Sequence, residues 1–128
     1  MNSSQTLSSK MIDSGEKLIQ YLDDHNFIVR AALWVNDSEF SNWRLVIASP
    51  EFRTFGPKKA YKRLLSQITK SNLTDFDLNQ ITIIDSNDSS IELLKSAVQT
   101  GSGISGMFFN QNTINGIRFP DSYIYRVN

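Results

Sequence analysis

The stretch FIVRAALWVNDSEFSNWRLVIAS, residues 27–49, decides how this chain folds. Its two ends, 27–35 and 43–48, are rich in aliphatic, β-branched and aromatic residues, and the segment between them is short and polar. Two such runs joined by a short polar loop are typical of an antiparallel β-hairpin. The sequence therefore predicts a sheet that is built on this hairpin.

Helices are predicted on both sides of the hairpin. Apolar residues recur at helical spacing from about residue 7 to residue 24, and again along a helix that Pro57 opens and that runs to about Lys70. The run Ser89-Ser90-Ile91-Glu92 has the spacing of a capping box. It predicts a third helix, which ends near Gln99.

The remaining apolar runs predict strands. The run 80–84 is almost continuously apolar, which favours a central strand that is covered on both faces. Further strands are expected at 107–109, 117–119 and 123–127. The order α-β-β-α-β-α-β-β predicts one α+β domain over residues 1–128, with a mainly antiparallel sheet and about three helices.

Composition excludes several kinds of site. The chain has 128 residues, of which 40% are hydrophobic, so it is long enough to bury a core of its own. Without cysteine it has no disulfide, no thiolate zinc site and no thiol nucleophile. His25 is its one histidine, so a histidine-based metal cage within one chain is excluded. It follows the first predicted helix, where an imidazolium suits the negative end of the helix dipole.

The run Gly101-Ser102-Gly103-Ile104-Ser105-Gly106 has the letters of a dinucleotide-binding fingerprint. A true fingerprint follows a strand and opens a helix, so that the pyrophosphate meets free amides. Here the run follows a predicted helix and precedes an apolar strand. We therefore interpret it as a helix C-cap and a flexible connection, and we predict no cofactor.

Two carboxylate patterns resemble metal sites without completing them. Asp75-Phe76-Asp77 has the D-x-D spacing of nucleotidyltransferases, but the glycine-serine turn that these enzymes need upstream is missing. Asp37 with Glu51-x-Arg53 loosely resembles restriction-like nucleases, but Arg53 replaces the lysine and Glu51 follows a proline beyond the strand. We predict solvated loop residues at both places, and no metal ligand.

Charge is unevenly distributed along the chain. The net charge is zero, yet the segment from residue 53 to residue 70 has no acidic residue. Five of its six basic residues lie along the predicted second helix, and Arg53 precedes it. They favour either a phosphate or nucleic-acid backbone site or a solvated face that is paired with nearby acids. The residues of this basic segment are Arg53, Lys58, Lys59, Lys62, Arg63 and Lys70.

The hairpin offers a second candidate surface, made by Arg30, Trp34 and Arg44. Arginine and tryptophan are common among the hot-spot residues of protein interfaces. If alternate residues of the first strand face the core, Arg30 and Trp34 share the other face. The alternative is that a helix covers this face and that Trp34 belongs to the core.

The sequence alone does not establish a function. Our first hypothesis is a small non-catalytic interaction or accessory domain, whose partner is another protein or a second copy. The second is a nucleic-acid-binding protein that uses the basic segment, and the third is a metal-dependent hydrolase with carboxylates dispersed along the chain. No apolar run approaches the roughly 20 residues that span a bilayer, so we expect a cytoplasmic protein without a membrane partner.

Overall fold

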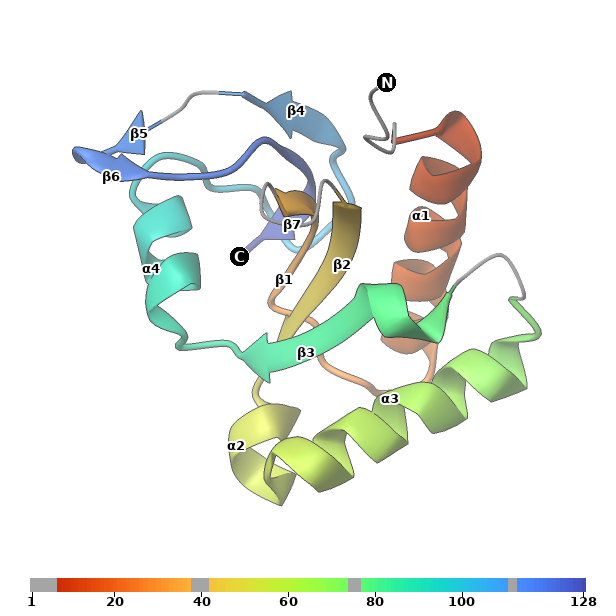
Figure 1. Ribbon diagram of the computed structural model, residues 1–128. Helices are drawn as coiled ribbons and strands as arrows, with labels where there is room; N and C mark the ends of the chain where they lie inside the picture. The colour runs from red at the N-terminus through yellow and green to blue at the C-terminus, as the bar shows by residue number, and fades with distance from the viewer. Residues whose placement is uncertain (1–6, 38–41, 74–76, 111–112) are drawn as a thin grey trace.

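One five-stranded sheet with helices on both faces forms the body of the protein (Figure 1). The computed structural model describes residues 7–37, 42–73, 77–110 and 113–128. A short 3-10 helix, Leu78–Gln80, precedes the third strand. The elements are α1 (Ser9–Asp24), β1 (Ala31–Asp37), β2 (Asn42–Ser49), α2 (Glu51–Phe55), α3 (Pro57–Ser71), β3 (Ile81–Asp85), α4 (Ser89–Lys95), β4 (Met107–Phe109), β5 (Thr113–Ile114), β6 (Ile117–Arg118) and β7 (Ser122–Val127).

The strand order across the sheet is β3-β2-β1-β7-β4. β1 and β2 form the predicted antiparallel hairpin, with Ala31 opposite Ala48 and Asp37 opposite Asn42. β7 is antiparallel to both β1 and β4, whereas β3 runs parallel to β2. The prediction of an α+β fold with a mainly antiparallel sheet is therefore confirmed. β5 and β6 pair with each other in a separate two-stranded sheet.

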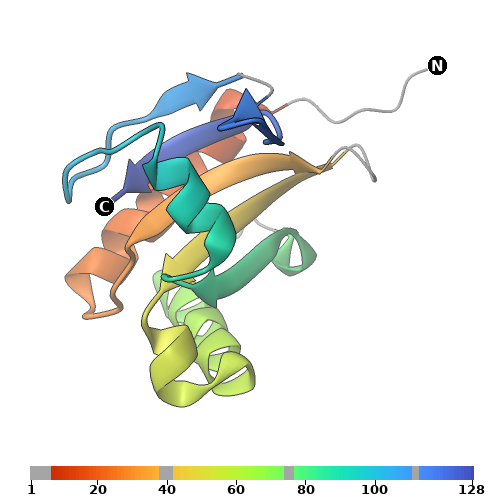
Figure 2. The same cartoon turned by 90° about the vertical axis from the view of Figure 1, so that its left-hand side faces the viewer.

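The predicted central position of the run 80–84 is wrong, because β3 forms one edge of the sheet. Ile81 and Ile83 pack into the cluster that α3 covers, and Ile84 packs against the opposite cluster. Contacts on both faces therefore explain the apolar run, without a strand on each side. Figure 2 shows α2 and α3 packed alongside β3.

One helix that was not predicted, and both ends of α4, differ from the prediction. Pro50 ends β2 as expected, but it also precedes α2, a helix that the sequence pattern did not reveal. Gly56 separates α2 from α3 with a φ of 84°, which glycine adopts far more easily than other residues. Asp88 rather than Ser89 caps α4, because Asp88 Oδ1 accepts a hydrogen bond from the Ser90 amide at 2.9 Å. α4 also ends earlier than predicted, at Lys95.

The sheet separates two apolar clusters. On one face α1 and α3 bury the larger cluster against β1, β2 and β3, and on the other face α4 and the segment around β5 and β6 bury a smaller one. Leu18, Leu22, Leu64, Trp34 and Ile47 are central to the larger cluster. Leu33, Ile91, Leu94, Phe109 and Phe119 belong to the smaller one.

Tyr125 connects α1 to the sheet. Its hydroxyl donates a hydrogen bond to the Ile12 carbonyl at 2.6 Å and accepts one from Trp34 Nε1 at 2.9 Å. Burial raises the pKa of Tyr125 well above its ordinary value of 10.0, because the phenolate would lose its hydration. A Cβ at Gly15 would lie 2.8 Å from Tyr125 Cζ and closer still to the hydroxyl. Glycine at this position is what lets α1 approach the ring.

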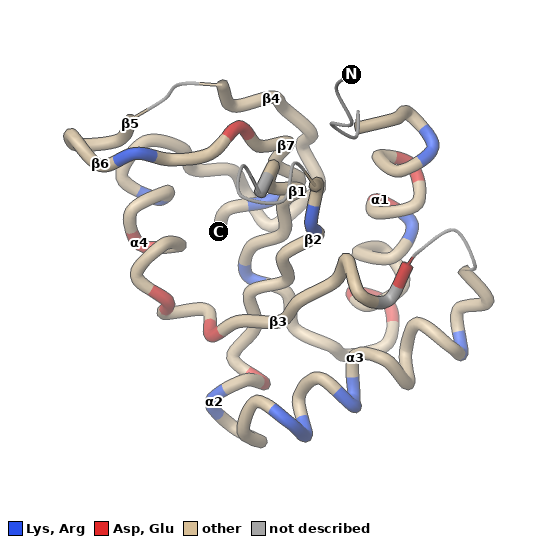
Figure 3. Tube along the Cα trace, in the orientation of Figure 1, with Lys and Arg blue, Asp and Glu red and all other residues tan. Residues whose placement is uncertain are grey.

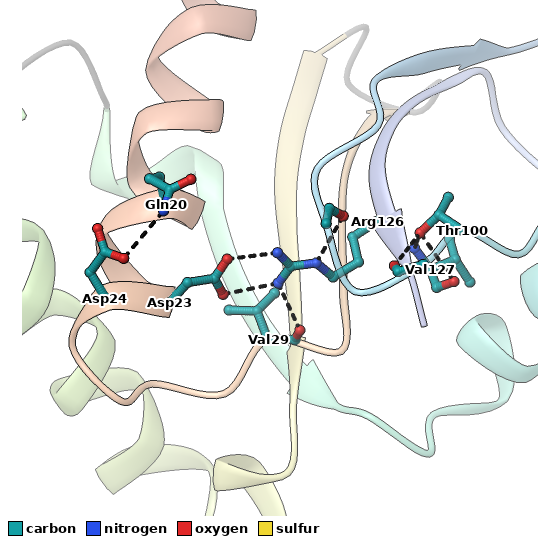
Figure 4. Close-up of polar contacts among 9 residues, drawn as sticks. Gln20, Asp23, Asp24, Val29, Thr100, Arg126 and Val127 are labelled. Carbon is teal, nitrogen blue, oxygen red and sulfur yellow. Dashed lines mark hydrogen bonds and ion pairs between the residues drawn. The ribbon is translucent and has the colours of Figure 1, made fainter.

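Arg126 is a buried charge, only 3% exposed. Its guanidinium donates to both carboxylate oxygens of Asp23, at 2.6 and 3.0 Å, and to the carbonyls of Val29 at 3.1 Å and Gly103 at 3.3 Å (Figure 4). These partners come from the end of α1, the segment before β1 and the glycine-rich run. One side chain of β7 therefore joins three separate parts of the chain.

Candidate functional site

The two faces of the sheet are covered unequally, and this leaves a groove. α1 and α3 have 16 and 15 residues, whereas α4 has 7. A helix of that length extends about 10 Å, while the eight residues of β2 extend about 26 Å. α4 is therefore too short to cover its face of the sheet. The β5 and β6 hairpin lies on the far side of the opening from α4 (Figure 1).

The groove has an aliphatic floor. Leu33, Val35, Val46 and Ile84 supply it from β1, β2 and β3, and the cavity measures about 770 Å³. Three of these four side chains are half-buried rather than buried, so the cavity leaves part of each accessible. We call this cavity the α4 groove. Its apolar walls come from α4 and from the segment that leads from β6 to β7, namely Ile91, Leu93, Ile117, Phe119 and Pro120.

The rim of the α4 groove is polar. Asp88 and Glu92 lie on the α4 side, where Lys95 is 4.0 Å from Glu92, and Arg118 lies on the β6 side. Among the described residues no ion pair involves Arg118. Asn115 Nδ2 donates to Ser96 Oγ at 3.2 Å, which links the hairpin to the end of α4. The groove can therefore accept an apolar group and offer charged partners beside it.

The residues predicted as a partner interface do not form one exposed surface. Trp34 is only 1% exposed and packs in the larger cluster with α1, which is the alternative that the sequence left open. Arg30 is exposed just before β1. Arg44 lies opposite Val35, next to the Trp34 partner Leu45, so its side chain points to the other face of the sheet. Covering of the face by α1 is the reason that the predicted surface fails.

Two arginines of the basic segment are held by acidic residues. Arg53 pairs with Asp85 at 3.0 Å, and Arg63 Nε donates to the nearly buried Glu51 at 2.6 Å. The Arg63 guanidinium also lies 4.4 Å from the centre of the Phe55 ring. These contacts show that Arg53 and Arg63 help to hold α2, α3 and β3 together.

The four lysines of the basic segment are exposed. Figure 3 shows that basic positions recur along α3, and the side chains of these lysines are exposed. Lys59 lies 5.2 Å from the centre of the Phe55 ring. In the described part of the chain, no ion pair involves Lys58, Lys59, Lys62 or Lys70. Among the described residues, acidic partners therefore hold the two arginines of the basic segment and leave its four lysines without an ion pair.

Two of the carboxylates that resembled metal sites, Asp77 and Glu51, have structural roles. Asp77 Oδ1 accepts from the Asn79 amide at 3.0 Å, which is an Asx turn. Asp75 lies outside the described residues, and Glu51 pairs with Arg63. No group of three histidine, aspartate or glutamate side chains in the described ranges could hold a metal ion. The structure thus gives the hydrolase hypothesis no site among these residues.

The other two sequence features also serve the fold. His25 is the C-cap of α1, its Nδ1 lies 2.7 Å from the Tyr21 carbonyl oxygen, and its ring stacks on that of Tyr21. The run 101–106 begins several residues after α4 ends, so it is not a helix C-cap. Its Ser105 amide donates to the Tyr125 carbonyl at 2.8 Å, which fixes the run against β7.

No sequence motif could have located the α4 groove. Its residues come from β1, β2, β3, α4 and the segment 115–120, and each residue is an ordinary aliphatic or polar one. The length of the helix after the capping run bears on the groove, because a short helix leaves part of the sheet uncovered. The predicted end near Gln99 made this helix longer than it is, since α4 ends at Lys95.

Comparison with protein-family models, with curated proteins and with solved structures gives no match to this chain. In the part of the chain that the structure describes, no helix has both the length and the apolar character to cross a membrane.

Proposed function

We propose that this protein is a non-catalytic interaction domain that binds an apolar segment of another protein in the α4 groove. The observation that carries the proposal is the accessible aliphatic floor beside a helix too short to cover it. Its volume of about 770 Å³ falls in the range of binding sites. The absence of cysteine is compatible with a cytoplasmic location, which we also propose.

The form of the groove favours a peptide over a small enclosed ligand. It is open along the surface, and its rim has hydroxyl, amide and charged groups on both sides, from Ser89, Ser90, Glu92, Asn115 and Arg118. Such groups can bond the main chain of a bound segment while its apolar side chains contact the floor. Glu92 and Arg118 then favour segments with a basic residue at one flank and an acidic residue at the other.

A displayed peptide library selected on the purified protein tests this proposal. Peptides that emerge are measured by calorimetry against the native chain and against Val46→Lys, which places a charge on the groove floor. We expect Val46→Lys to weaken binding at least about tenfold. Ile28→Lys is the matched control, because Ile28 is exposed and does not line the α4 groove. Equal binding to both variants would exclude the groove as the site.

A second candidate function, binding of a nucleic-acid phosphate backbone, is favoured by the four exposed lysines on α3. Lys58 and Lys62 lie one turn apart and Lys59 is beside them, so their charges act on one side of the helix. Phosphate backbones attract such a row without any base being read.

Fluorescence anisotropy with labelled single-stranded and double-stranded oligonucleotides tests this second function. Affinity should fall steeply with salt, and Lys58→Glu/Lys62→Glu should flatten the slope of log K against log salt by about 2. These lysines are better targets than Arg63, whose reversal would place two carboxylates together at Glu51. Lys17→Glu/Arg30→Glu removes the same charge elsewhere and should leave the slope unchanged. Salt-independent binding, or none, would rule the function out.

A further inference from the structure

β4 forms an edge of the sheet, and an apolar row leads across all five strands to it. The register places Ile81, Leu45, Trp34, Tyr123 and Phe108 opposite one another, from β3 through to β4. The row is buried in β1, β2 and β3, half-buried at Tyr123, and ends at Phe108, which is 58% exposed. The Phe108 and Tyr123 rings form a T-shaped pair, with centroids 4.9 Å apart. The apolar row thus extends from the buried core to the solvent-exposed side chain of Phe108.

The β4 edge lacks the usual protection of a free strand. Natural proteins place lysines, prolines or inward charges on such edges to prevent pairing with another chain. Here the sequence has no charged residue and no proline between Lys95 and Arg118. Met107, next to Phe108, is also exposed, at 39%. In both ribbon views β4 lies along the outer border of the sheet (Figures 1 and 2).

We propose that β4 is a homodimer interface, at which the β4 strands of two copies pair antiparallel about a two-fold axis. With Phe108 on the axis, Phe108 lies opposite Phe108 of the second copy, and Met107 lies opposite Phe109. Directly opposed residues point to the same face. Every cross-strand pair is then apolar, and the row that ends at Phe108 continues into the second molecule.

Self-pairing fits this edge better than pairing with a charged partner strand. A two-fold interface must be complementary to itself. In Met107-Phe108-Phe109 it is, because an apolar side chain meets an apolar side chain on each face of the sheet. The zero net charge of the chain removes long-range repulsion between copies. A strand of three residues makes few main-chain bonds, so the dimer belongs to the weak and reversible class of interfaces. This interface is separate from the α4 groove and does not depend on it.

Sedimentation equilibrium over a wide range of protein concentration tests the dimer. The native chain of 14.6 kDa should approach twice that mass as concentration rises. Phe108→Lys should raise the dissociation constant at least about tenfold, with an unchanged circular dichroism spectrum. Ile28→Lys, a change of another exposed apolar residue that lies outside the α4 groove, should dimerise as the native chain does. A native chain that stays monomeric, or a dimer that persists in Phe108→Lys, would overturn the proposal.

Cysteine cross-linking tests the register, because the chain has no cysteine of its own. A Phe108→Cys thiol would lie opposite its own copy, within the Cα separation that a disulfide needs. A Met107→Cys thiol would lie diagonally from its copy, at about 7–8 Å. Mild oxidation should therefore link Phe108→Cys and leave Met107→Cys largely monomeric. Equal linking, or none at Phe108→Cys, would contradict the two-fold pairing.

Discussion

At the scale of single residues, the structure depends on a close contact that hydrophobic patterning does not show. Gly15 lies on the buried side of α1, and the hydrophobic pattern does not show that this position requires glycine. The Tyr125 hydroxyl fills the space that a side chain would occupy there. The sequence also does not decide whether Trp34 is exposed or buried. An aromatic residue in a strand belongs to the core if a helix covers that face of the sheet, and to the surface if none does. Both answers come from the side of the sheet on which α1 packs, which the sequence pattern does not give, and for Tyr125 the contact also joins opposite ends of the chain.

Gly15→Ala should lower the free energy of unfolding by about 1–3 kcal/mol, because the new Cβ overlaps a hydroxyl held by two hydrogen bonds. Urea denaturation measures this change. Gly103→Ala is the matched control, since a Cβ there meets nothing within 4 Å. If both variants unfolded at the native urea concentration, the contact between α1 and Tyr125 would not constrain the fold.

Tyr125→Phe should change how stability depends on alkaline pH. The folded-state pKa of Tyr125 is raised, so its contribution is complete below the ordinary value of 10.0. Above that pH the unfolded chain ionises while the folded chain keeps the proton, and stability falls. Urea midpoints from about pH 9 to about pH 11 should therefore fall more steeply for the native chain than for Tyr125→Phe. Parallel curves would mean that the buried phenol does not govern this loss.

At the scale of elements, local pattern and long-range pairing account for different parts of the fold. Hydrophobic period and turn residues predicted α1, the β1 and β2 hairpin, α3, β4 and β7 within a few residues of their observed bounds. They could not place β3 at an edge, because a buried run has the same composition wherever both its faces are covered. They also could not show the α4 groove, which exists only because five separate segments meet.

α4 is the element on which the groove depends, and Asp88 fixes where it begins. Asp88→Ala should lower the free energy of unfolding by about 1 kcal/mol, because the Ser90 amide loses its acceptor. Ser89→Ala should have little effect, since Ser89 is the first helical residue and not the cap. Thermal unfolding of the two variants decides between these positions. A larger loss in Ser89→Ala would support the capping box that the sequence suggests.

At the scale of the whole molecule, β7 connects parts that the sheet otherwise keeps apart. Tyr125 reaches α1 on one face, Ile124 and Val127 pack in the cluster on the other, and Arg126 joins Asp23 to the glycine-rich run. The exposed features lie elsewhere, with the α4 groove on one face, the lysines along α3 and Phe108 at the β4 edge. β7 therefore supports the β4 edge directly and contacts α4, whereas α3 packs against α1, α2 and β3.

Arg126→Met should lower the free energy of unfolding by about 1.5–3 kcal/mol, because it removes four hydrogen bonds of a buried charged group, while the partly exposed Asp23 can still be hydrated. Arg53→Met is the matched control. The Arg53 pair with Asp85 is largely exposed, so its loss should cost about 0–1 kcal/mol. Urea denaturation compares the two, and equal losses would show that the buried pair contributes no more than a surface one.

The place of β7 in the chain also affects the order in which the protein can be assembled during synthesis. β7 leaves the ribosome after every other element described here, yet it lies between β1 and β4. Until it emerges, β4 has no strand beside it, and Asp23 and Ile12 lack the side chains that bond them. While β7 is still inside the ribosome, the nascent chain therefore exposes an incomplete sheet, in which β1 and β4 both lack the strand that lies between them. A chain with such unpaired strand edges is prone to misassembly.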